Sequence, residues 1–177
     1  MKKILLLIGL IIVLIGLSLT LYSKPMKKIE VGDKVPSFTL LDQDGNTVAI
    51  SPEYGKAMVI YFYPKDDTPG CTKEACKFRD DFEDFKDLGV EVFGISGDSV
   101  ESHKKFAEKY NLPFQLLADT KNKVRKLFGV PSSFLILPGR VTYVIDDKGV
   151  VQYIFNSQFS AEKHIENALN IFKGIKS

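Results

Sequence analysis

The sequence has few of the side chains that bind metals and little excess charge of either sign. Its 177 residues include two cysteines and two histidines, and the formal net charge is +2. His103 and His164 have no ligand spacing around them, which argues against a metal site, and we interpret both as solvated helix positions. With no basic stripe and no interleaved aromatic residues, the chain shows no electrostatic signature of nucleic-acid binding.

Internal repeats, low-complexity runs and a second linker are also absent. The segment 24–28, which contains Pro25, is typical of a short linker. We therefore expect residues 29–177 to form a single globular domain. A hydrophobic content of 45% is sufficient for an ordinary core in a chain of this length.

One long hydrophobic run stands at the N-terminus. Ile4 to Tyr22 carries no charge and is about as long as a bilayer-spanning helix, and Lys2 and Lys3 precede it. A cleaved signal peptide would show a shorter run and a small-x-small cleavage site, and a buried core helix would need a second domain to cover it. The sequence thus predicts an uncleaved membrane anchor over residues 1–23. Lysines on both sides nearly balance the positive-inside rule, with a slight preference for an extracytoplasmic domain.

After the linker, short apolar runs alternate with helical patterns. Strands are predicted at Phe38–Leu41, Thr47–Ile50, Ala57–Tyr63, Val90–Ser96, Phe114–Leu117, Val141–Ile145 and Val150–Ile154. Helices are predicted at Lys73–Phe85, Val100–Tyr110, Lys121–Phe128 and Ala161–Phe172. This alternation predicts an α/β fold, a thioredoxin-like sandwich with a central mixed sheet and flanking helices. The fold alone does not define a function.

The two cysteines, Cys71 and Cys76, lie five residues apart after an apolar strand. Thr68 and Pro69 indicate a helix start, because Thr is a favoured N-cap and Pro is favoured at the first helical position. Cys71 then falls in the first turn, where free N–H groups and the positive end of the helix dipole favour a thiolate. The alternative, a small buried hydrophobic residue, fits poorly at a polar strand-to-helix turn.

The spacing of the pair restricts what it can do. Five residues of helix place the two Cα atoms roughly 8.7 Å apart, and a disulfide requires less than about 7 Å. A bond between Cys71 and Cys76 would therefore require the helix to unwind, which argues against a permanent staple. A nucleophilic Cys71 and a resolving Cys76 would pass from thiolate to sulfenic acid to disulfide, the chemistry of peroxide reduction. Thiol–disulfide exchange would favour Cys-x-x-Cys, in which both sulfurs share the first turn.

Pro64, Thr68 and Cys71 form a Pro-x-x-x-Thr-x-x-Cys pattern, and Cys71 with Cys76 forms Cys-x-x-x-x-Cys. These motifs resemble those of the peroxiredoxins, and within them the Q type, also called bacterioferritin comigratory proteins. The resemblance extends from Ile29 to Lys173. It includes the segments Gly94–Ser96, Ser102–Phe106, Leu112–Phe114 and Leu137–Tyr143.

The resemblance implies a role for each matching residue. Cys71 would be the peroxidatic nucleophile and Cys76 the resolving thiol. Thr68 would hydrogen-bond the sulfur and the incoming peroxide, and Pro64 would shield the thiolate from water. Arg140 matches the family's active-site arginine and would stabilise the thiolate and the transferring oxygens, whereas the residues alone favour a surface ion pair for it.

Two charged residues near the cysteines are left outside the predicted catalytic set. Arg79 stands beside Asp80 and Asp81, where a solvated ion pair is the more common arrangement. Glu74 is interpreted as a favourable acidic residue in the first turn of the helix.

As a whole, the resemblance implies a thiol-dependent peroxidase for hydrogen peroxide and organic hydroperoxides, acting in antioxidant defence and redox homeostasis. Thioredoxin or a similar dithiol would recycle the enzyme, no metal, haem or flavin would be needed, and the protein would be a monomer. Two alternatives are a membrane-tethered thiol–disulfide oxidoreductase and a non-catalytic thioredoxin-like binding module. Loss of activity in Cys71→Ser would exclude the second.

Overall fold

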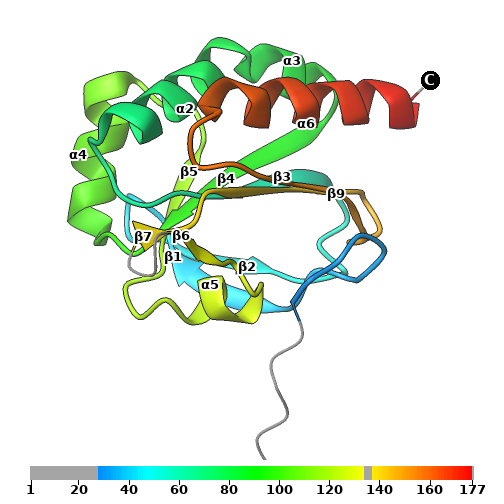
Figure 1. Ribbon diagram of the computed structural model, residues 1–177, viewed down its shortest axis with the longest axis horizontal. Coiled ribbons are helices and arrows are strands. Elements are labelled where there is room, and N and C mark those ends of the chain that lie inside the picture. The colour runs from blue at the N-terminus through cyan, green and yellow to red at the C-terminus, as the bar shows by residue number, and fades with distance from the viewer. Residues whose placement is uncertain (1–27, 134–136, 177) are drawn as a thin grey trace, which may run out of the picture.

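The computed structural model describes residues 28–133 and 137–176, and within them a mixed sheet lies between helices (Figure 1). The strands are β1 (Phe38–Leu41), β2 (Thr47–Ile50), β3 (Ala57–Phe62), β4 (Val90–Ser96), β5 (Gln115–Ala118), β6 (Ser132–Ser133), β7 (Leu137–Pro138), β8 (Val141–Ile145) and β9 (Val151–Asn156). The helices are α2 (Pro69–Asp80), α3 (Phe82–Asp87), α4 (Val100–Tyr110), α5 (Lys123–Leu127) and α6 (Ala161–Lys176). The thioredoxin-like α/β fold with a mixed central sheet is confirmed.

The order of the strands brings two distant segments of the chain together. The seven-stranded sheet has the order β2-β1-β5-β4-β3-β8-β9, in which β3, β4 and β5 are parallel and β8 is antiparallel to β3. Phe62 at the end of β3 pairs with Val141 at the start of β8. The residues that follow β3 and those that precede β8 therefore meet at one end of the sheet.

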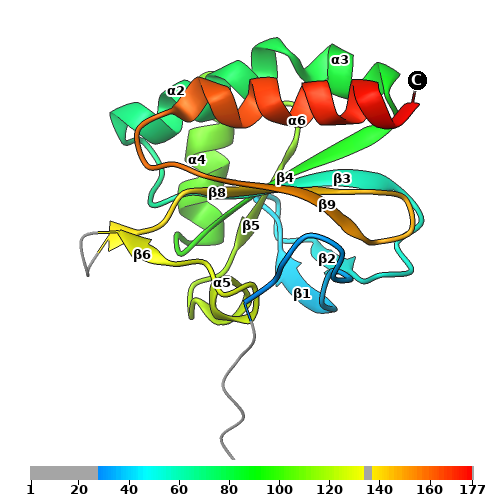
Figure 2. The same ribbon diagram turned by 45° about the vertical axis from the view of Figure 1, so that its right-hand side comes forward.

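Strand β3 is apolar throughout because both of its faces are covered. Val59 and Tyr61 pack in the cluster that includes Phe78 of α2, on the side of α2, α3 and α6. Ile60 and Phe62 pack in the opposite cluster, on the side of α5. Figures 1 and 2 show these two layers on either side of the sheet. A central strand buried on both faces loses the polar alternation of an exposed one.

The helix predicted over Lys73–Phe85 is two helices. Helix α2 begins earlier, after Thr68 as N-cap and with Pro69 in its first turn, in agreement with the capping signals. It ends at Asp80, and Asp81 leaves the helical conformation with φ −98° and ψ 11° before α3 begins. The apolar periodicity continues through this break, so periodicity alone could not reveal it. The short pair β6–β7 was not predicted either.

Both histidines are buried, so their interpretation as solvated positions was wrong. Each has a relative exposure of 0%. His103 lies on the α4 face that also buries Phe106 and Ala107, and His164 lies on the α6 face with Ala168. These i, i+3 and i, i+4 spacings are a helical core pattern in the sequence that could have indicated burial.

The predicted membrane helix, Ile4 to Tyr22, lies outside the described residues, as does all of the predicted linker except Lys28. Within residues 28–133 and 137–176, every helix is too short or too polar to cross a bilayer.

Gly94 in β4 provides a test of the packing against Tyr61. A Cβ at position 94 would lie 2.6 Å from the Tyr61 ring and 2.8 Å from Leu116. Because these side chains are buried, we expect Gly94→Ala to lower the free energy of unfolding by about 1–3 kcal/mol. Gly97→Ala is the control, since its Cβ would meet its nearest neighbour, Asn122, at an ordinary 3.4 Å. Urea denaturation of both variants measures the difference, and equal stabilities would contradict the packing argument.

Candidate active site around Cys71

Cys71 lies in the first turn of α2 with a relative exposure of 2%. The helical hydrogen bonds start with the Thr72 N–H, which donates to the Thr68 carbonyl at 2.8 Å. The N–H groups of Gly70 and Cys71 precede this bond and have no partner one turn earlier in the helix. The Thr68 hydroxyl does not cap them, because it donates to the Lys65 carbonyl at 3.1 Å. The turn therefore keeps backbone donors for an anion near the sulfur.

Arg140 reaches Cys71 from the segment just before β8, the strand next to β3. It immediately precedes β8, whose pairing with β3 brings it beside the segment that leads to α2. Its Nη2 donates to Cys71 Sγ at 3.3 Å, its Nη1 donates to Glu74, and its Nε donates to the Gln158 carbonyl at 3.3 Å. The guanidinium is only 3% exposed. The surface ion pair that the residues alone suggested for Arg140 is therefore wrong.

Gly70 makes room for this contact. A Cβ at position 70 would lie 3.1 Å from Nη2 of Arg140, closer than most Cβ contacts. A larger residue at position 70 would displace the Arg140 guanidinium from the sulfur. The glycine before Cys71 thus has a steric reason in addition to its place in the turn.

Glu74 belongs to the site, although the sequence analysis left it out. Its side chain is fully buried and accepts a hydrogen bond from Arg140. Burial raises the pKa of Glu74 from 4.5 to about 8, although Arg140 acts in the opposite direction. Burial lowers the pKa of Arg140, but Glu74 and Cys71 outweigh it and the net direction is upward. One turn of helix separates Glu74 from Cys71, and that spacing is the signal that both side chains share a face.

His164 borders Glu74 without neutralising it. Burial lowers the pKa of His164 to about 4, so the imidazole is uncharged at neutral pH. Its Nε2–H donates to the Ser157 carbonyl at 2.9 Å, and its Nδ1 accepts from the Thr142 hydroxyl at 2.7 Å. Nδ1 is 3.7 Å from the nearer Glu74 oxygen, which has no hydrogen-bond partner among the described residues. Arg140, and not His164, is therefore the charged side chain bonded to Glu74.

Arg125 of α5 holds both segments that carry the site. Its Nη2 donates to the Tyr63 carbonyl at 2.7 Å, and its Nη1 donates to the Gly139 carbonyl at 2.8 Å. These carbonyls belong to the residues immediately before Pro64 and Arg140. Burial lowers the pKa of Arg125 to about 10, which still leaves it charged at neutral pH. No local sequence pattern predicts this role, because its partners are backbone atoms far away in the chain.

The structure brings some predicted site residues into contact and leaves others apart. Cys71 and Arg140 touch, while Pro64 and Thr68 lie half-buried on the segment that enters α2. Cys76 is half-buried further along the same helix, and both cysteines are free thiols. Helix α2 is continuous between them. Unwinding thus remains a requirement for a bond between the two.

Arg79 makes contacts that fit a structural role. It pairs with the Asp80 carboxylate at 2.7 Å and donates to the Tyr110 carbonyl at 2.9 Å. The second bond connects α2 to the end of α4. Its exclusion from the predicted catalytic set agrees with these partners.

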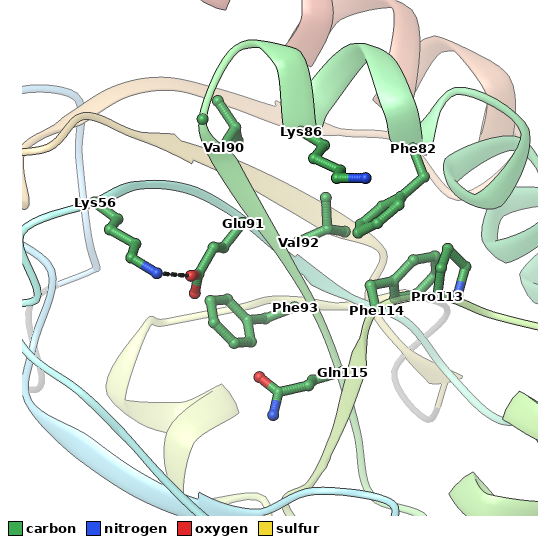
Figure 3. A pocket seen from close by; sticks show the side chains of 11 residues that line it. Lys56, Phe82, Lys86, Val90, Glu91, Val92, Phe93, Pro113, Phe114 and Gln115 are labelled. Carbon is green, nitrogen blue, oxygen red and sulfur yellow. Dashed lines mark hydrogen bonds and ion pairs between the residues drawn. The ribbon is translucent and has the colours of Figure 1, made fainter.

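A cavity of about 530 Å³ lies away from this cluster. Phe82, Val92, Phe93 and Phe114 are among its lining residues (Figure 3). It borders the first half of β4, which runs parallel to β3, whereas Cys71 follows the opposite end of β3. We therefore do not assign this cavity to the chemistry of Cys71.

Known proteins share both the sequence and the architecture of this chain. Residues 31–154 match the model of the AhpC/TSA family. The chain is 60% identical over 149 residues to a chloroplastic peroxiredoxin Q of Triticum aestivum, covering 84% of this chain and 69% of that protein. The crystal structure of the peroxidoxin BcpB from Mycobacterium tuberculosis superposes with a TM-score of 0.77 and 37% identity, over 84% and 99% of the two chains.

A third similar protein is the bacterioferritin comigratory protein of Xanthomonas campestris. Its structures concern alkyl peroxide reduction and a trapped intermediate, and the match has a TM-score of 0.73 and 27% identity. It covers 79% of this chain and 92% of that one.

The prediction of a membrane-anchored protein is contradicted by these comparisons. The curated relatives are named as chloroplastic peroxiredoxins, not as membrane proteins. The single-helix anchor, the membrane partner and the extracytoplasmic placement are therefore not supported. The length of one uncharged hydrophobic run, the lysines around it and the lack of a cleavage site had suggested them.

The ionisation of Glu74 predicts how stability depends on pH. Between pH 4.5 and about 8 the folded protein holds one proton more than the unfolded chain at this site, so stability falls as the pH rises. The fall is at most about 1.4 kcal/mol per pH unit. Glu74→Gln has no such proton, so its free energy of unfolding should rise relative to that of the wild type between pH 5 and 8. Urea unfolding at each pH measures this difference.

Glu101→Gln is the matched control, because Glu101 is exposed and Lys105 lowers its pKa. Its free energy of unfolding relative to that of the wild type should not rise over the same range. A constant difference between the wild type and Glu74→Gln would contradict the raised pKa of Glu74.

Proposed function

Because this chain belongs to the AhpC/TSA family, within its peroxiredoxin Q group, and is a thiol-dependent peroxidase, we propose that Cys71 is the thiol that attacks the peroxide. The contact between Arg140 and the Cys71 sulfur carries this proposal. It places a buried positive charge at the one end of α2 where backbone donors are also available. Cys76 lies farther along α2, where the backbone N–H groups are bonded within the helix.

In the first step, the Cys71 thiolate attacks the distal oxygen of the peroxide. A sulfur–oxygen bond forms, the O–O bond breaks, and the leaving oxygen takes a proton and departs as water or an alcohol. Arg140 stabilises the thiolate and then the charge on the transferring oxygens, because its donors are fixed before the reaction. The free N–H groups at the start of α2 supply further donors. The Thr68 hydroxyl supplies another once it no longer donates to the Lys65 carbonyl. Pro64 restricts water at the entry to α2.

In the second step, Cys76 resolves the sulfenic acid. Its thiolate attacks the Cys71 sulfur, a disulfide forms, and the hydroxyl leaves as water. Residues Thr72–Ala75 must unwind for the sulfurs to meet. Unwinding also removes Glu74 from Arg140 and breaks the buried hydrogen bond between them, which has a free-energy cost. This cost keeps the helix folded until oxidation has occurred.

A dithiol then reduces the disulfide and returns both thiols. We propose thioredoxin or a similar dithiol protein in this role, with hydrogen peroxide and organic hydroperoxides as substrates, in antioxidant defence and redox homeostasis. The alkyl peroxide reduction named for the Xanthomonas campestris relative supports the organic substrates. From the resemblance to the family we also propose a monomer with a single catalytic domain that begins near residue 29. The same family membership argues against a disulfide oxidoreductase and a non-catalytic module.

Serine variants of the two cysteines test the assignment. We expect Cys71→Ser to abolish rapid oxidation by hydrogen peroxide and tert-butyl hydroperoxide in stopped-flow experiments. Cys76→Ser should still react at the normal rate but stop at a sulfenic acid that dimedone traps. Fast oxidation of Cys71→Ser would exclude Cys71 as the nucleophile. Oxidised wild-type protein in which peptide mapping finds no bond between Cys71 and Cys76 would exclude Cys76 as its partner.

Variants of Arg140 test the role of its donors. Arg140→Gln removes the charge, and we expect the rate constant of peroxide attack to fall by about 100- to 1,000-fold. Arg140→Lys keeps the charge but cannot reach Cys71 and Glu74 together, so it should recover only part of the rate. Competition with a haem peroxidase for limiting peroxide measures these constants. Lys123→Gln, on the exposed surface of α5, is the control. An unchanged rate in Arg140→Gln would refute the role.

A further inference from the structure

Helix α4 binds the loop between β3 and α2 through a buried carboxylate. Asp66, five residues before Cys71, accepts three side-chain hydrogen bonds. Tyr63 donates to it at 2.7 Å, Ser102 at 2.7 Å, and His103 Nδ1 lies 3.0 Å away. Burial acts to raise the pKa of Asp66, but the bonds from His103, Ser102 and Tyr63 outweigh it and the net direction is downward. We call Asp66, Tyr63, Ser102 and His103 the Asp66 clamp.

The same loop is held at two further points. The Asp66 N–H donates to Asp98 at 2.9 Å, and Asp98 accepts from the Ser96 hydroxyl at 2.6 Å. Asp67 accepts from Lys109 Nζ at 2.7 Å and from the Tyr110 hydroxyl at 3.0 Å. Asp67 also has a positive φ of 57°, a conformation that a non-glycine residue adopts only when its surroundings hold it there.

We propose that Ser102 and His103 are positioning residues for peroxide attack, which fix the loop from Pro64 to Thr68 through Asp66. This inference rests on the proposed role of Cys71. Neither residue contacts the sulfur, so they act through the loop that sets the start of α2. The loop determines where Thr68 and the first backbone donors of the helix stand relative to Cys71.

The burial of the clamp explains why it can fix the loop firmly. Asp66 is 6% exposed and His103 is fully buried. A buried carboxylate that loses a donor keeps the cost of its desolvation, so the loop resists conformations that break the clamp. Charge-assisted hydrogen bonds to a carboxylate are also stronger than bonds between neutral groups. An exposed clamp with the same partners would hold the loop less tightly.

The Asp66 clamp should affect the rate constants of the two chemical steps differently. Peroxide attack requires the loop and the first turn of α2 in their folded positions. Resolution by Cys76 begins from the unwound helix, in which that turn is already lost. Loss of the clamp should therefore slow attack and leave resolution as fast or faster. A general loss of stability would not move the two rate constants apart in a protein that stays folded.

His103→Leu tests this inference, because leucine removes the donor and fills the buried position with an apolar side chain. We expect the rate constant of attack to fall by about 10- to 100-fold while that of disulfide formation does not fall. Rapid-quench mass spectrometry of the full chain with hydrogen peroxide separates dithiol, sulfenic acid and disulfide. His103→Asn restores a donor near the Nδ1 position and should recover most of the attack rate. Lys105→Ala, on the exposed face of α4, is the control.

Ser102→Ala gives a second test if His103→Leu does not fold, since Ser102 is only half-buried and makes a single bond to Asp66. It should slow attack alone, to a smaller degree. Equal effects on both steps, no effect in either variant, or no rescue by asparagine would overturn the inference. Wild-type protein in the same experiment tests the proposed function separately, because failure of Cys76 to form the disulfide would be visible there.

Discussion

The site depends on one buried guanidinium that contacts both a sulfur and a carboxylate. Arg140 lies between Cys71 and Glu74, which stand one turn apart on the same helix. A buried guanidinium needs hydrogen-bond acceptors, and a buried thiolate needs donors, so each group makes the burial of the others possible. The sheet supplies the geometry, because the pairing of β3 with β8 brings Arg140 to the start of α2.

This interaction also links the two steps of the reaction. The folded first turns of α2 hold Cys71 and Glu74 against Arg140, and that is the arrangement suited to peroxide attack. The disulfide with Cys76 requires the same turns to unwind and the hydrogen bond between Arg140 and Glu74 to break. The protein must therefore keep the two conformations within a few kcal/mol of each other. Arg125 and the Asp66 clamp both hold the segment that leads into α2, which limits which part of the chain moves.

Local patterns were sufficient to predict the fold and the position of Cys71. The apolar run of β3, the helical spacing of α4 and the Thr68-Pro69 start of α2 each report on neighbouring residues, and the structure confirms them. The contact of Arg140 with Cys71 joins distant segments, and the residues alone did not predict it. The resemblance to a known family supplied that residue.

Buried polar residues were the main failure of the sequence analysis. Glu74 and His164 were assigned to a first turn and to a solvated face, because charge and polarity alone suggest exposure. Their burial depends on partners that the fold brings from other strands and helices. The spacing of His103 from Phe106 could have indicated its burial, but its partner Asp66 belongs to a distant loop. The membrane anchor is a different case, since the names of the curated relatives contradict it.

The central claim is that α2 is folded for peroxide attack and unwound in the disulfide. Hydrogen exchange of its backbone amides, measured in the dithiol form and in the Cys71–Cys76 disulfide form, tests this most directly. The account predicts that the amides of Thr72 to Cys76 are protected in the dithiol and lose protection in the disulfide, while those of β3 stay protected in both. Equal protection of α2 in the two forms would contradict it.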